Sequence, residues 1–251
     1  MFPLRPDLDA IHSDAIEFAS VIQNKIASSG GCKNLASEAL NILARSAILT
    51  HRSVRTLCEE GWTPVTSVLN RTLLDLFANC VAVANKPADA DYMGFKYVTH
   101  FYRKWLTDPH ITNPERTNVN AIIDELVGRL QHPDQIRARQ LLLETEPTVY
   151  WYQPDFGSPK KVLALATHST YDMFKFLSGP THGGYAMKIL FNDDPNSEDI
   201  EPQEHARNVP KAIAASTRFL LEVCYIRDHF DNQGKNEPIY QTLVARLAAL
   251  I

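Results

Sequence analysis

The chain has 251 residues, of which 45% are hydrophobic and 22% are charged. These proportions are typical of a globular protein with a sizeable core, and they exclude a disordered or fibrous chain. The 29 acidic and 25 basic residues leave a formal net charge of −4, so no global positive field favours nucleic-acid binding. The composition, with 15 prolines and 10 glycines and few alternating β-branched runs, predicts an all-α fold.

The cysteines and the absence of a leader pattern indicate the compartment. The four cysteines form neither a CxxC pair nor a Cys/His cluster at zinc spacing, so we expect reduced thiols and no metal. The first residues lack a cationic stretch followed by an apolar one. The most apolar segment, residues 63–85, carries Arg71 and Asp75 at its middle. The sequence therefore predicts a cytoplasmic protein with no membrane partner.

Helical periodicity covers the first half of the chain. Apolar residues recur every three or four positions over residues 9–28 and stop at Gly30-Gly31. Asn34 is placed to cap a second helix that reaches residue 57, and Thr63-Pro64 opens a third that continues to about residue 85. A fourth helix is predicted over residues 88–106. Two more helices start at Asn113-Pro114 and Pro133-Asp134, the second ending near residue 145.

The second half of the chain is less regular. Residues 147–159 are predicted to be irregular or briefly extended, and residues 193–204 to be a solvated acidic loop. Further helices are expected over residues 160–167, 170–178 and 209–231, and from about residue 238 to the end. No repeat or linker divides the chain, so the prediction is one domain over residues 1–251, an all-α bundle of about nine helices.

The third helix carries the first group of candidate site residues. Most of its circumference is apolar, so it should lie at the centre of the bundle. The remaining sector holds Arg71 and Asp75 four residues apart, bordered by small residues. Buried charges are costly unless they are paired. We therefore expect Arg71 and Asp75 to be mostly buried and to form an ion pair, with a purely structural role as the alternative.

The second group lies near residue 180. Tyr171 and Ser178 share one helical face, and the chain then breaks at Gly179-Pro180 and presents His182. A histidine at this position can act as an acid or base near neutral pH, or can hydrogen-bond a helix end.

These two groups together carry a family resemblance. Residues 59–62 (Glu-Glu-Gly-Trp) followed by a Leu-x-Arg-x-x-x-acid pattern over residues 69–75, and later Trp151 and the run from Tyr171 to His182, resemble the bacterial family catalogued as domain of unknown function number fifty-six seventy-seven. The similarity spans about residues 61–182, with Asp75 where the family typically has Glu. The resemblance implies an all-helical fold and a shared Arg/acid/His site, without a reaction.

The function predicted from these residues is the binding, and hydrolysis, of a small or phosphorylated ligand. Arg71 would hold an anionic group, Asp75 would orient Arg71 or His182, and His182 would be the acid or base. Tyr171 and Ser178 would line the ligand. No nucleotide, Rossmann, zincin or α/β-hydrolase motif occurs, so no cofactor is predicted.

Two alternatives remain open. Arg45 and His51 are spaced like the Arg and His of HEPN ribonucleases, helical toxins and phage-defence effectors that cleave RNA without metal. In that case both residues should lie on one exposed face, opposite a two-fold mate in a homodimer. The other alternative is a structural or partner-binding helical module. Lys96, His100 and Arg103 also share a face of the fourth helix, which either meets an anion or is simply solvated.

Overall fold

The computed structural model describes residues 4–28, 30–61, 63–143, 147–148, 150–166 and 202–250, without the side chains of 63–64 and 202–208. These residues form ten α-helices and one 3₁₀ turn, with no strand among them. The all-α prediction is therefore confirmed.

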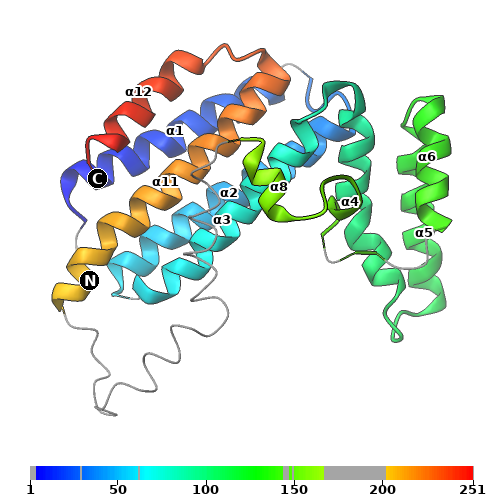
Figure 1. Ribbon diagram of the computed structural model, residues 1–251, viewed down its shortest axis with the longest axis horizontal. Coiled ribbons are helices and arrows are strands. Elements are labelled where there is room, and N and C mark those ends of the chain that lie inside the picture. The colour runs from blue at the N-terminus through cyan, green and yellow to red at the C-terminus, as the bar shows by residue number, and fades with distance from the viewer. Residues whose placement is uncertain are drawn as a thin grey trace.

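The largest part of the protein is a bundle of long helices. α1 (Pro6–Ser28), α2 (Leu35–Glu59), α3 (Thr63–Ala84) and α11 (Pro202–Asn232) lie alongside one another, and α12 (Glu237–Ala248) packs on α1 and α11 (Figure 1). Their apolar faces meet in one core, to which Ile11, Leu43, Phe77 and Leu220 contribute. The prediction that α3 is the central helix is wrong, because α11 is the helix that packs against α1, α2, α3 and α12. α3 packs against α2 and α11 on one side, and Val65 and Val68 near its start remain exposed.

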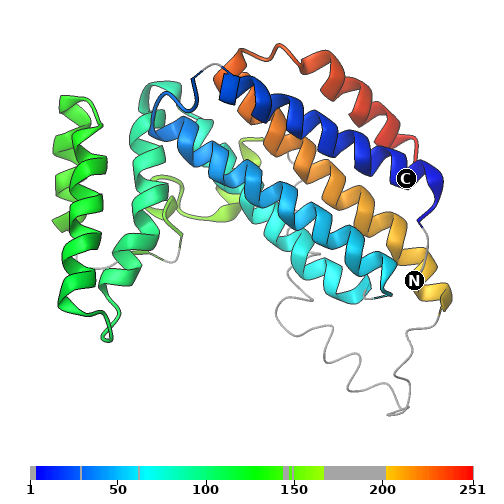
Figure 2. The same ribbon diagram turned by 180° about the vertical axis from the view of Figure 1, so that it is seen from behind.

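A smaller arm extends from this bundle. After the turn η1 (Pro87–Asp89), α4 (Ala90–Leu106) crosses α2 and α3, while α5 (Asn113–Gly128) and α6 (His132–Leu143) pack on α4 away from the bundle (Figure 2). Gly94 makes this crossing close, since a Cβ there would lie 2.6 Å from the backbone of Leu35 and Ala36. The arm has its own apolar cluster, which includes Phe95 and Ile123.

In the segment predicted to be irregular or briefly extended, the described residues 147–148 and 150–152 lie outside any helix, whereas residues 153–159 contain a helix and the start of another, so the prediction is wrong for that part. α7 (Gln153–Phe156) and α8 (Pro159–Ala164) each have a proline in the first turn, where its missing N–H is not needed. Gly157, with φ of 76°, ends α7. α8 then packs on α3, which brings this segment over the polar sector of that helix.

The last long helix begins earlier than predicted. α11 starts at Pro202 and contains Pro210, whereas the sequence indicates a start near residue 209 and assigns residues 202–204 to the acidic loop. Pro202 is at the first position of the helix, where a proline is tolerated, whereas Pro210 lies inside it, where a proline cannot donate the usual backbone hydrogen bond. The helix predicted over residues 170–178 and most of the acidic loop lie outside the described residues.

α3 is long and apolar enough to cross a membrane, and it is the one such helix in the part of the chain that the structure describes. More than half of its apolar stretch, 56%, is buried inside the bundle. The buried part packs against the neighbouring helices, while Val65 and Val68 near the start of the helix are exposed.

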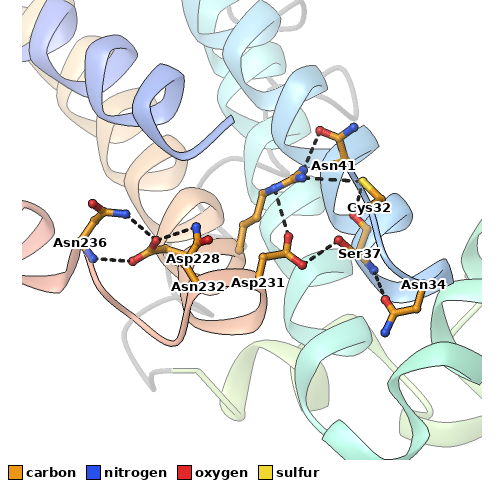
Figure 3. A network of polar contacts seen from close by, with 9 residues as sticks. Cys32, Asn34, Ser37, Asn41, Asp228, Asp231, Asn232 and Asn236 are labelled. Atoms are coloured by element: carbon orange, nitrogen blue, oxygen red, sulfur yellow. Dashed lines mark hydrogen bonds and ion pairs between the residues drawn. The ribbon is translucent and has the colours of Figure 1, made fainter. Parts of the chain in front are cut away.

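Buried polar contacts join α2, α11 and the start of α12 (Figure 3). Arg227, 1% exposed, donates to the side-chain oxygen of Asn41 at 2.8 Å, with Asp231 3.5 Å from its Nε. Asp228, also 1% exposed, accepts from the backbone and side-chain nitrogens of Asn236 at 2.8 and 2.6 Å. Each charge is therefore compensated inside the fold, as burial requires.

Candidate functional site

The ion pair predicted on α3 is present. Arg71 Nε lies 3.1 Å from Asp75 Oδ2, and Arg71 is 8% exposed. The prediction that both residues are mostly buried is wrong for Asp75, whose side chain is 40% exposed. Four residues along a helix rotate the side chain by about 40°, which takes Asp75 toward the edge of the polar sector. The pair therefore has an inner cation and an outer carboxylate.

Tyr152, from the segment before α7, lies close to this pair. Tyr152 is buried, and its ring stacks on that of Tyr150 with centroids 5.5 Å apart. Burial and the nearby carboxylate of Asp75 raise the pKa of Tyr152, with Arg71 acting in the opposite direction. The phenol is therefore protonated at neutral pH and is a hydrogen-bond donor beside the ion pair.

Asn79 continues the polar row of α3 one turn beyond Asp75. Its side-chain nitrogen donates to the backbone oxygen of Asp75 at 2.7 Å, and its oxygen accepts from the indole N–H of Trp151. Trp151 is buried and meets the ring of Tyr97 edge-on at 5.7 Å. These contacts anchor the segment before α7 onto α3 and α4 together.

The cationic face of α4, formed by Lys96, His100 and Arg103, lies against the segment that contains Thr148, Trp151 and Pro154. Lys96, 5% exposed, pairs with Asp155 of α7. A small cavity of about 20 Å³ is lined by Lys96, His100, Arg103, Leu141, Thr148, Trp151 and Pro154. Burial, together with Lys104 and Arg103, lowers the pKa of His100 to about 4. The imidazole is therefore neutral at pH 7, and the local field is positive.

The other three residues of the predicted pocket belong to a part of the chain that the structure does not describe. Tyr171, Ser178 and His182 lie outside the described residues. The expected approach of His182 to Arg71 and Asp75 therefore stays a prediction.

The spacing of Arg45 and His51 does not produce a common exposed face, so that expectation is wrong. Arg45 is exposed on α2, but His51 is 0% exposed, with Nδ1 3.0 Å from Ser216 Oγ and its ring stacked on that of His12 at 4.1 Å. Six residues of an α-helix rotate by about 600°, which turns the two side chains about 120° apart. His51 consequently enters the core between α1 and α11.

Sequence reasoning missed several members of the site. Asn79 extends the Arg71 and Asp75 spacing by another four residues, a signal that the helical wheel could have revealed. Tyr152 and Asp155 carry no comparable signal, because their partners are on other helices.

The fold and site define an all-α bundle with a polar face on α3 and a cationic pocket on the adjoining arm. The family of unknown function DUF5677 matches residues 37–199, and the chain belongs to this family, as the resemblance predicted. The match includes α2 to α8, and so contains the ion pair and the cationic pocket. Neither the curated proteins nor the solved structures contain a match.

Proposed function

We propose that the protein binds a small anionic ligand at the polar face of α3 and hydrolyses it when it is a phosphate ester. The buried Arg71, oriented by Asp75 beside a protonated Tyr152, is the observation that carries this proposal. A guanidinium held by a carboxylate presents a planar array of donors that suits a phosphate or carboxylate. The phenol of Tyr152 adds a neutral donor on the same side.

The hydrolytic step rests on the sequence prediction for residues near 180. In the proposed reaction water attacks phosphorus, the ester P–O bond breaks, and one proton of the water reaches the leaving oxygen through His182. Arg71 stabilises the charge on the phosphoryl oxygens, and Asp75 maintains the orientation of Arg71. Tyr171 and Ser178 contact the rest of the ligand.

The test uses inorganic phosphate for binding and para-nitrophenyl phosphate for hydrolysis. R71M, which removes the charge but keeps an apolar side chain, should weaken binding of inorganic phosphate about tenfold or more. H182Q should lose hydrolysis and retain binding. R45M, on the exposed face of α2, is the control and should match the wild type. Wild-type affinity in a folded R71M protein would contradict the proposal.

The proposed location is the cytoplasm. All four cysteines are described and are free thiols, which is the usual state in a reducing compartment. The ribonuclease alternative has no comparable support, since His51 is enclosed in the core.

A further inference from the structure

A groove between α1 and α12 has no role in the proposed function, and both of its helices lie outside residues 37–199, which match the family. We infer that this groove binds a small apolar ligand that carries a primary ammonium group. The groove shares no residue with the polar face of α3, so its test is independent of the proposed function.

The two helices that form the groove are antiparallel and lie at the edge of the bundle (Figure 2). Arg246, near the end of α12, donates to Asp14 of α1 at 2.6 Å. Lys25, near the end of α1, donates to Asn236 just before α12 at 2.7 Å. These contacts join the helices at both ends and leave an open groove of about 520 Å³ between them. This volume is within the range of small-molecule sites.

Apolar side chains form the floor and much of the walls of the groove. Phe18 of α1 and Leu243 of α12 are buried, at 3% and 4% exposed, and form the floor. Val21 and Ile239 line the groove farther out, and Ile239 is 45% exposed. An exposed isoleucine next to buried apolar side chains is hydrocarbon surface that a ligand can remove from water.

Among the lining residues, one polar side chain is available to a ligand. Asp14 and Arg246 compensate each other, and the hydroxyl of Thr242 donates to the backbone oxygen of Pro238 at 2.9 Å. Glu17 is exposed and forms no hydrogen bond or ion pair with any residue that the structure describes. A carboxylate accepts hydrogen bonds and cannot donate one. The groove is therefore complementary to a ligand with a cationic donor.

The size of the groove favours a small molecule over a protein partner. On α1 the lining extends from residue 14 to residue 21, about 10 Å along the helix axis. A protein interface usually takes about 20 to 30 residues from each partner, which is far more than line this groove. A hexyl chain can lie along this length, with its ammonium group beside Glu17 and its carbons against Phe18 and Leu243.

The site is tested by titrating hexylammonium chloride into the full chain while the methyl signals of Val21, Ile239 and Leu243 are followed by NMR. Saturable shifts of these signals are expected. E17Q should weaken binding about three- to fivefold, because it removes one exposed ion pair. I239N should weaken it by a similar factor, because it removes apolar contact surface. Both positions are exposed, so neither substitution disturbs the core.

Two analogues test the charge of the ligand. Hexanol lacks the charge and hexanoate reverses it, so both should bind about threefold or more weakly than hexylammonium. E60Q, at the exposed end of α2, is the matched control for E17Q and should retain the wild-type affinity. Equal affinity for hexanol, an unchanged affinity in E17Q or I239N, or methyl signals that do not respond to hexylammonium would overturn the inference.

Discussion

The bundle and the arm are stabilised in different ways. The core of the bundle encloses polar groups with specific partners, such as Arg227 with Asn41 and Asp228 with Asn236. The arm has a small apolar cluster, and among its described residues α6 contributes only Ala138 and Leu141 as buried side chains. Removing one partner leaves a buried polar group without its hydrogen bond and so destabilises the core of the bundle. A small apolar cluster can instead unfold locally while the rest of the protein stays folded.

This difference bears on the site, because α4 belongs to both regions. Met93 of α4 contributes to the core of the bundle, and Phe95 contributes to the cluster of the arm. Leu141 of α6 is the one lining residue of the cationic pocket that comes from the outer helices α5 and α6. We therefore expect the pocket on α4 to respond to local opening of the arm, while the ion pair on α3 depends on the bundle.

The largest expected effect is in the polar core of the bundle. D228A removes the acceptor for two nitrogens of the buried Asn236, and should lower the free energy of unfolding by about 3 to 5 kcal/mol. Urea unfolding measures this loss. D134A, which removes a surface partner of Arg137 in the arm, is the matched control. An equal loss of unfolding free energy in the two variants would contradict the proposed difference between the bundle and the arm.

The next effect concerns the apolar cluster of the arm. I123A leaves a cavity beside Phe95 and Leu126 and should cost about 2 to 4 kcal/mol. The loss should be local, so hydrogen exchange should accelerate in α5 and α6 while α1 and α11 keep their protection. Uniform acceleration throughout the chain would show that the arm and the bundle unfold as one unit.

Acid should act on the bundle through its stacked histidines. Burial, and then the charge of Arg55, lower the pKa of His12 from 6.5 to about 4, and burial followed by His12 lowers that of His51. Between pH 6.5 and about 4 the unfolded chain binds a proton that folded His12 does not, so stability present above this window falls as the pH drops. The loss due to His12 is about 2 to 3 kcal/mol.

Urea unfolding at pH 7 and pH 5 measures this dependence. H12L should reduce the change with pH without abolishing it, because the burial that lowers the pKa of His51 remains. H132Q, at an exposed position of α6, should retain the wild-type dependence. An unchanged slope in H12L would rule out His12 as a cause.

The smallest effect is expected where the arm meets the bundle at the surface. Arg129 at the end of α5 donates to both carboxylate oxygens of Glu38 in α2, with each side chain about a third exposed. A double-mutant cycle of R129A and E38A should give a coupling of about 0.5 kcal/mol that shrinks in high salt. A coupling above about 2 kcal/mol would mean that this pair, rather than apolar packing, holds the arm in place.

The sequence by itself determined the features that depend on neighbours along the chain. The cap of α2, where Asn34 accepts from the backbone nitrogen of Ser37 at 2.9 Å, and the capping box of Thr112 and Glu115 before α5 are local hydrogen bonds. The ion pair on α3 is equally local, since a separation of four residues places two side chains on the same face. The family followed from short motifs whose order along the chain is readable without a structure.

Only the tertiary structure decided which segments meet. The indole of Trp151 reaches Asn79 across 72 residues, and His51 is enclosed because α1 and α11 cover its face of α2. Helical periodicity shows that a residue lies on a given face of its helix, but it does not show what covers that face. The covering depends on packing among all the helices, a sum of many weak apolar contacts that no single spacing in the sequence encodes.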